Sequence, residues 1–220
     1  MKMSTDVEAQ PDHAEGPPPG RSTKEDWLGL ALETLIRDGI DRVKVQIMAK
    51  RLGVSRSSFY WYFKSSRDLH DQILDLWLTK NTGPIIQRAL RPSHTITEAI
   101  LNVFECWMDE RLFDPELDVA VRLWARRDAG VHAVVVGADQ QRLDALSRMF
   151  TRHGYEDSEA LIRARVLYFT QIGHYTLGIN ESTEQRLTRT RDYLRAFSGL
   201  DPTEHELKRF KALANELGKA

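Results

Sequence analysis

Apolar residues recur three and four positions apart along most of the chain, which is the spacing that places them on one face of an α-helix. No segment shows the strict alternation of apolar and polar residues that a half-buried strand requires. The sequence therefore predicts an all-α fold. Gly83-Pro84 is expected to kink or break one of the helices. The expected helices cover residues 23–38, 45–52, 55–63, 65–90, 95–112, 115–127, 129–153, 157–179, 183–197 and 202–217.

Residues 45–63 (VQIMAKRLGVSRSSFYWYF) have the pattern of two short helices joined by a tight turn. Ala49 is small enough to let a crossing helix approach closely. Gly53 can adopt the left-handed conformation that ends a helix, and Ser55 can cap the next one. This arrangement predicts a helix-turn-helix unit.

Consecutive aromatic residues end this unit, and they cannot all face one neighbouring helix. Phe59 and Phe63 lie four positions apart, so they share a helix face and are expected to enter the core. The other faces carry donors that can reach base edges or hold phosphates when a helix lies in the major groove of DNA. The residues expected to contact DNA are Lys44, Gln46, Ser55, Arg56, Ser57, Ser58, Tyr60, Trp61, Tyr62 and Lys64.

Residues 24–77 resemble the DNA-binding domain of the TetR/AcrR transcriptional regulators. The resemblance covers about a quarter of the chain and rests on Ala49, Gly53-Val54-Ser55, Phe59-Tyr60, Phe63-Lys64 and Leu69. It implies phosphate contacts by Tyr60, Tyr62 and Lys64, and an approach to the major groove by Arg56, Ser57 and Trp61.

The sequence departs from this family's pattern at three positions. Lys44 stands where a threonine usually caps the second helix, Tyr62 replaces a histidine, and Ser66 falls where a lysine is common. These departures concern individual phosphate contacts and leave the motif intact.

Charge is divided unevenly along the chain. Residues 21–67 contain ten basic and five acidic residues, a net of +5, whereas the whole chain has a formal net charge of −1. Subtracting +5 from −1 leaves −6 for the remainder. A basic segment in an otherwise acidic chain is typical of a nucleic-acid interface, and it indicates that the two parts meet different partners.

The resemblance also implies that the later helices bind a small effector and form a homodimer through a four-helix bundle. Residues 157–179 and one of the two closing helices are the candidates for this bundle, because Ala160, Ala164 and Gly173 would let helices approach closely. A dimer would also place two recognition helices at half-sites about 34 Å apart. The residues expected to line an effector pocket are Trp107, Arg122, Trp124, Tyr168, His174 and Tyr175.

These patterns divide the chain into a disordered tail (1–21), a helix-turn-helix DNA-binding domain (22–67) and a helical effector-binding and dimerisation domain (68–220). The apolar runs are too short to span a bilayer, and the lone Cys106 fits a reducing cytoplasm. Paired histidines, zinc-type cysteines and phosphate-binding loops are absent from the sequence, so we expect no metal, no cofactor and no enzymatic activity.

The sequence thus predicts a cytoplasmic, homodimeric transcription factor that binds a palindrome in double-stranded DNA as a repressor and is released by an unknown small effector. Activation is an alternative to repression, because the sign of the effect on transcription depends on where the operator lies. A helical interaction module that keeps the DNA-binding unit is another, and an enzyme acting on a molecule held by the aromatic residues is a third. An ordinary αα-hairpin would explain residues 45–63 without DNA, but it gives no role to the exposed donors and the positive charge.

Overall fold

A computed structural model places residues 22–217, so the tail predicted at residues 1–21 lies outside the described residues. The described part contains helices and no strand, which confirms the all-α prediction. The α-helices are α1 (Lys24–Asp38), α2 (Val45–Leu52), α3 (Ser66–Trp77), α4 (Gly83–Leu90), α5 (Ile96–Met108), α6 (Pro115–Ala125), α7 (Ala129–Thr151), α8 (Asp157–Thr176), α9 (Thr183–Ser198) and α10 (Glu204–Leu217). Two 3-10 helices, η1 (Ile40–Arg42) and η2 (Arg56–Trp61), and one π-helical turn, η3 (Leu78–Thr82), complete the described elements.

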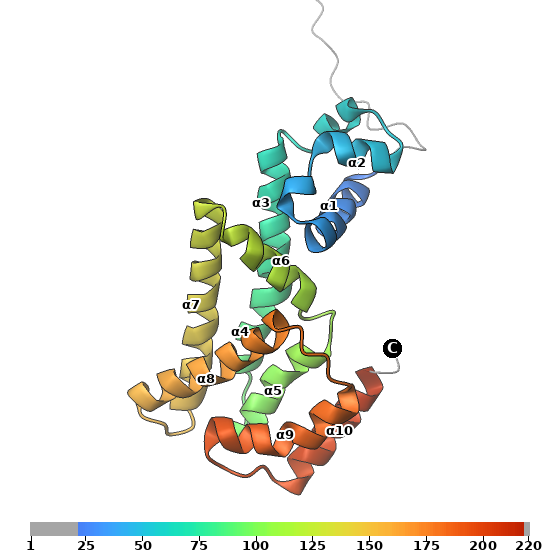
Figure 1. Ribbon diagram of the computed structural model, residues 1–220. Coiled ribbons are helices and arrows are strands. Elements are labelled where there is room, and N and C mark those ends of the chain that lie inside the picture. The colour runs from blue at the N-terminus through green and yellow to red at the C-terminus, as the bar shows by residue number, and fades with distance from the viewer. Residues whose placement is uncertain (1–21, 218–220) are drawn as a thin grey trace, which may run out of the picture.

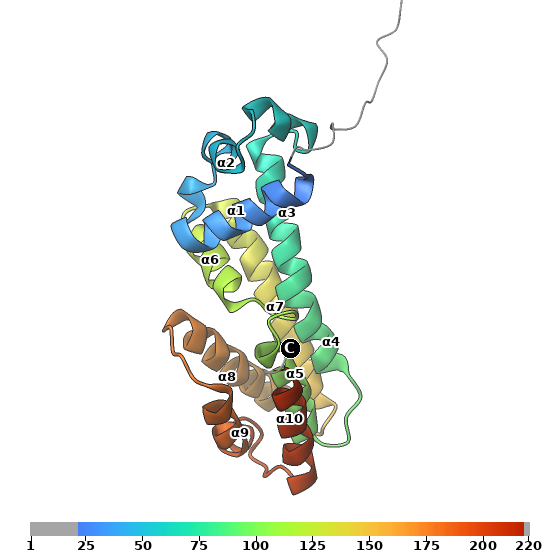
Figure 2. The ribbon, with the colours of Figure 1, turned by 90° about the vertical axis from the view of Figure 1, so that its right-hand side faces the viewer.

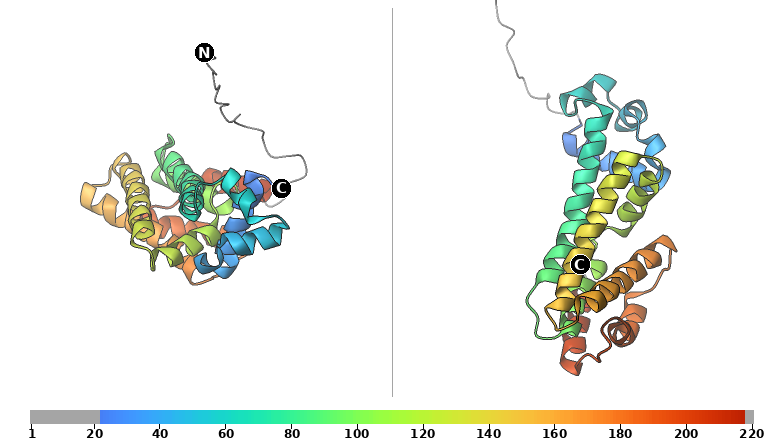
Figure 3. Two further views of the ribbon diagram at one scale, coloured as in Figure 1. Left: turned by 90° about the horizontal axis from the view of Figure 1, so that it is seen from above. Right: turned by 90° about the vertical axis from the view of Figure 1, so that its left-hand side faces the viewer.

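The helices form a small head joined by a rod to a larger helical part (Figure 1). α1, α2 and η2 make up the head at one end. α3, η3 and α4 form the rod, and α7 lies beside it (Figure 3). α5, α8, α9 and α10 gather at the end away from the head (Figure 2), and α6 packs against both α1 and α7.

Several helices are shorter than the sequence pattern predicts, and the second helix of the helix-turn-helix unit is a 3-10 helix. The Ser55 side chain does not cap it; instead the Ser55 hydroxyl lies 2.8 Å from that of Ser57. α5 ends at Met108, where Asp109 becomes extended and its carboxylate binds Arg111. Short polar side chains that bond locally compete with the helical ladder at these ends.

The rod passes through Gly83-Pro84 without a break. Proline lacks an N–H and clashes with the preceding turn of a regular α-helix. The chain accommodates it with the wider π-helical turn η3 directly before α4. The predicted kink or break is therefore a local change of helix type.

Two hydrophobic clusters form the core. One contains head residues, including Trp27 and Phe59, together with Trp77 of α3, Trp124 of α6 and Val135 of α7. The other fills the space among α4, α5, α7, α8, α9 and α10. The core of the head thus includes apolar residues from α6 and α7, far from it in the sequence.

Candidate DNA-binding surface and effector cavity

The turn between α2 and η2 has the predicted geometry. Gly53 has φ 68° and ψ 27°, the left-handed conformation in which a side chain would be strained. Its N–H bonds to the carbonyls of Ala49 and Lys50, and the N–H of Val54 bonds to Ala49 O at 3.0 Å. These bonds satisfy carbonyls at the end of α2 and fix the direction in which η2 leaves it.

The aromatic run separates into inward and outward rings. Phe59 and Phe63 are buried and stacked, with ring centroids 5.0 Å apart, and Trp27 meets Phe59 edge-on at 5.3 Å. Tyr60 and Trp61 are 61% and 51% exposed. This confirms that Phe59 and Phe63 are the core rings.

The outward face of the head presents polar and basic side chains. The side chains of Lys44, Gln46, Ser55, Arg56, Ser57 and Lys64 are exposed, as the sequence predicts for DNA-contacting residues. Lys44, Gln46, Arg56, Ser57 and Tyr60 border an open groove of about 880 Å³. The head therefore offers a continuous surface of donors around η2.

Two of the expected DNA contacts have other roles. Ser58 is buried, and its hydroxyl donates to Ser55 O at 2.7 Å, so it stabilises the turn and cannot reach DNA. The Tyr62 hydroxyl donates to Ser22 O at 2.8 Å. A phosphate contact by Tyr62 would require that bond to break, so Tyr62 ties the end of η2 to the residues that precede α1.

Contacts that the sequence pattern did not reveal orient the head. Arg51 of α2 donates to Glu33 at 2.8 Å and to Thr34 at 3.0 Å, which holds α2 on α1. The hydrogen bond from Arg51 lowers the pKa of Glu33. On the other side, His70 of α3 packs edge-on against Trp124 of α6 at 5.2 Å, and burial lowers the pKa of His70.

A buried polar cluster joins the rod to the larger part. Asp118 of α6 accepts hydrogen bonds from Trp77 Nε1 of α3 at 2.9 Å and from Arg122 Nε at 2.7 Å. Arg142 of α7 donates to Thr82 Oγ1 at 2.8 Å and to the Tyr168 hydroxyl of α8 at 2.6 Å. The cluster therefore connects α3, η3, α6, α7 and α8 through side chains alone.

The Tyr168 hydroxyl lies at the centre of this cluster. It accepts from Arg122 and Arg142 and donates to Asp139 at 2.7 Å. Burial alone would raise the pKa of Asp139, but the hydrogen bond and charge of Arg122 outweigh burial and lower it. Burial raises the pKa of Tyr168, so its hydroxyl keeps its proton. The cluster holds two arginines and two aspartates, and their charges balance.

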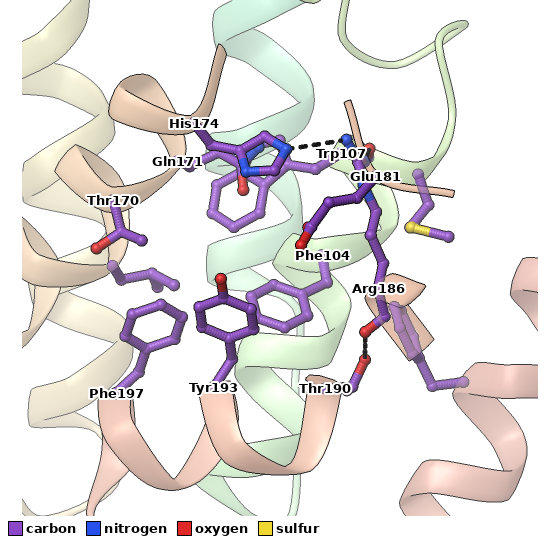
Figure 4. Close-up of a pocket in the computed structure, with 13 residues that line it drawn as sticks. Phe104, Trp107, Thr170, Gln171, His174, Glu181, Arg186, Thr190, Tyr193 and Phe197 are labelled. Carbon is purple, nitrogen blue, oxygen red and sulfur yellow. Dashed lines mark hydrogen bonds between the residues drawn. The ribbon is translucent and has the colours of Figure 1, made fainter. Parts of the chain in front are cut away.

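A cavity of about 70 Å³ lies among α5, α8, α9 and α10. Figure 4 shows Phe104, Tyr193 and Phe197 along one side of it and Trp107, His174, Glu181 and Arg186 toward the other. Arg186 Nη2 lies 3.4 Å from His174 Nε2, and burial together with Arg186 lowers the pKa of His174. The lining residues are Phe104, Trp107, Met108, Leu167, Thr170, Gln171, His174, Glu181, Arg186, Thr190, Tyr193, Phe197 and Phe210.

Two of the predicted pocket residues line the cavity, and the other four lie elsewhere. Trp107 and His174 line the cavity. Arg122 and Tyr168 belong instead to the buried polar cluster, and Trp124 belongs to the core of the head. Tyr175 stacks on Phe113, with ring centroids 5.5 Å apart.

The lone cysteine is a core residue. Cys106 is fully buried in α5, and burial raises its pKa to about 12. A thiol with such a pKa stays protonated and unreactive near neutral pH. None of the helices in residues 22–217 is long and apolar enough to cross a membrane.

The head, rod and larger part define a class: an all-α protein with an N-terminal helix-turn-helix unit. Residues 28–73 match the family described as bacterial regulatory proteins, tetR family. The tetracycline repressor protein class A from transposon 1721 of Escherichia coli is 34% identical over 62 residues. That segment is 28% of this chain and spans only 29% of the repressor.

Two solved structures share the fold over most of both chains. Mycobacterium smegmatis AmtR has a TM-score of 0.61 and 17% identity, covering 93% of this chain and 98% of that one. Salmonella enterica GusR has a TM-score of 0.52 and 14% identity, covering 90% and 95%. At these identities the likeness concerns the fold. Residues 28–73 thus form a domain of the tetR family of bacterial regulatory proteins.

Proposed function

We propose that the protein is a sequence-specific, DNA-binding repressor that acts in the cytoplasm as a homodimer on a palindromic operator and is released by a small effector. One observation carries this proposal: the core rings hold η2 in place while Arg56, Ser57 and Tyr60 face outward from it. In this proposal residues 22–67 bind DNA, and residues 68–220 bind the effector and dimerise.

Selection of random duplex DNA by the purified protein, followed by footprinting of the selected sequences, tests this proposal. A palindrome with half-sites about one helical turn apart, about 34 Å, is the expected result. Binding that varies with salt and not with sequence would contradict it. That result would favour a helical interaction module whose specificity lies in the larger part.

Arg56 and Lys64 should have different effects on binding. Arg56→Ala is expected to cost about 1–3 kcal/mol of binding free energy on the operator and to relax the preference at one base pair, because a forked guanidinium reads a base edge. Lys64→Ala should weaken all sequences alike and lower the salt slope by about one, because one fewer counterion is released. Gel-shift titrations of operator and random DNA at several salt concentrations measure both effects. Equal losses on both DNAs from Arg56→Ala would make Arg56 a phosphate contact.

The exposed face of α8 supports the proposed dimer. Ile162, Val166 and Phe169 are about half exposed and follow one another around a single face of the helix, with Gly173 one turn further on. The opposite face packs on α7. Ala160 and Ala164, which we expected to serve this contact, are instead buried in the chain's own core. An apolar stripe that ends at a glycine still suits close packing against the same stripe of a second chain.

Phe169→Asp is therefore expected to convert the dimer to a monomer at micromolar concentration, because it places a charge in an apolar interface. Sedimentation equilibrium measures the change, and operator affinity should fall with it since the two heads no longer bind as a linked pair. Leu123→Asp is the matched control, because Leu123 is 56% exposed but lies on α6. A dimer that persists in Phe169→Asp would place the interface on other helices.

The arrangement of α8 supports effector-controlled release. Leu167 and Gln171 of α8 line the cavity. Tyr168, which lies between them in the sequence, accepts a hydrogen bond from Arg142 through its hydroxyl. Arg142 in turn bonds to Thr82 in the rod. An effector that shifts α8 would move Tyr168, which is linked to the rod through Arg142, and thereby change the separation of the two heads in the dimer.

A further inference from the structure

We infer that the cavity among α5, α8, α9 and α10 selects a small carboxylate with a single aromatic ring, and that Arg186 binds its carboxylate group. This inference rests on the proposed effector role of the cavity and names the chemical class of the effector. It is carried by the charge, the aromatic walls and the size of the cavity.

The guanidinium of Arg186 has only neutral partners. Arg186 Nη1 donates to the carbonyl of Trp107 at 3.0 Å, and Nη2 lies 3.4 Å from His174 Nε2. The hydroxyl of Tyr175 also contacts it. Within residues 22–217, no carboxylate forms an ion pair with Arg186.

A partly buried arginine with no ion pair is unusual in this protein. Arg88, Arg122 and Arg142 each bind at least one carboxylate. A charge removed from water needs an opposite charge to compensate for the lost hydration. Arg186 therefore lacks the negatively charged partner that an anionic ligand would supply.

The remaining charges around the cavity leave it positive. Glu181 is the one carboxylate among the lining residues, and it is paired with Arg189. His174 accepts from Arg186 through Nε2, which requires the unprotonated nitrogen. The charge of Arg186 is thus uncompensated where a ligand would lie.

The rest of the lining suits a flat ring. Tyr193 and Phe197 are stacked with centroids 5.6 Å apart, and Phe104 meets Phe197 edge-on at 6.3 Å. Trp107 adds a fourth ring, 5.5 Å from Phe104. The cavity volume of about 70 Å³ corresponds to roughly five to seven water-sized groups, at about 10–15 Å³ for each. A single aromatic ring is about this size, and Tyr193, one of the lining residues, is 36% exposed.

Three probes of the same shape test the inference: benzoate, benzamide and benzamidine, which are anionic, neutral and cationic. Isothermal titration calorimetry on the full chain should show benzoate binding at least about tenfold more tightly than benzamide, because hydrogen bonds to a charged acceptor are the stronger ones. Benzamidine should bind more weakly than either. In Arg186→Gln the preference for benzoate should disappear, and in Arg186→Lys part of it should remain.

Arg195→Gln is the matched control, because Arg195 lies on the same helix at an exposed position outside the cavity. It should keep the preference for benzoate. Equal binding of benzoate and benzamide to the unmodified protein would overturn the inference, and so would a preference that survives Arg186→Gln. Binding of none of the three would also overturn it, since the cavity would then not accept a single-ring carboxylate.

This experiment separates the inference from the proposed function. A protein that selects a palindrome but does not prefer benzoate would refute only the ligand class. A protein that prefers benzoate but selects no DNA sequence would refute the proposed function. The inferred preference of the cavity for a single-ring carboxylate would still hold. Binding of benzoate that leaves operator affinity unchanged would separate the site from regulation, and would overturn its assignment as the effector class.

Discussion

Replacing Asp118 by alanine is expected to lower the free energy of unfolding by about 3–5 kcal/mol, because removing one partner of a buried ion pair leaves the other charge uncompensated. Asp118 is 1% exposed and accepts from Trp77 and Arg122. Arg142, fully buried, would keep only Asp139 as an acidic partner, at 3.4 Å. Urea denaturation followed by circular dichroism measures the loss.

The matched control is an exposed ion pair of the same type. Asp41 binds Arg127 at 2.7 Å, but both side chains are 73% exposed. Exposed pairs contribute about 0–1 kcal/mol, so Asp41→Ala should change the free energy of unfolding very little. If Asp118→Ala cost no more than Asp41→Ala, water would be reaching the cluster and our account of it would be wrong.

The cluster also bears on regulation. Well-packed apolar residues can replace a buried ion network with little loss of stability, or even a gain, so stability alone does not explain why a core contains one. Here the hydrogen bonds of Arg142 and Tyr168 require α7, α8 and the rod to meet in one register. Tyr168→Phe removes only the central hydroxyl. We therefore expect it to reduce the effect of effector binding on DNA affinity more than it reduces the affinity of the cavity for the effector or of the head for DNA.

The helix-turn-helix unit could be predicted from the sequence because its signals are local. Gly53 needs its left-handed conformation wherever the unit lies, and the four-residue spacing of Phe59 and Phe63 identifies the buried pair. The spacing of apolar residues does not indicate the type of helix. It also does not indicate which short polar side chains form local hydrogen bonds. The 3-10 geometry of η2 and the burial of Ser58 depend on such local hydrogen bonds.

The cavity and the polar cluster depend on contacts between distant parts of the chain. Trp107 and His174 were found because aromatic and polar residues favour pockets, but the same criterion selected Tyr168 and Trp124, which lie elsewhere. The sequence did not identify Arg186 as a cavity residue, because an arginine on an amphipathic helix usually faces water. The spacing of Asp118 and Arg122 is that of a helical ion pair, yet nothing in it indicates burial.

Phe59→Ala should destabilise the head by about 3–5 kcal/mol, because it removes a fully buried ring and leaves a cavity. Phe59 contacts Trp27, Phe63 and Tyr60, so no neighbouring ring can fill the space without losing its own contacts. Urea denaturation measures the loss, and operator binding should fall with the folded fraction. A loss under about 1 kcal/mol would mean that η2 does not depend on this ring.

Tyr60, the next residue, should behave in the opposite way. Its ring is 61% exposed and meets Phe59 only edge-on, so Tyr60→Ala should change the free energy of unfolding by no more than about 1 kcal/mol. Tyr60→Phe should leave stability unchanged and weaken operator binding by loss of the hydroxyl. The salt slope should stay the same, because a neutral donor releases no counterion. Together, the Phe59 and Tyr60 variants distinguish a ring that positions η2 from one that contacts DNA, since only the former couples binding to folding.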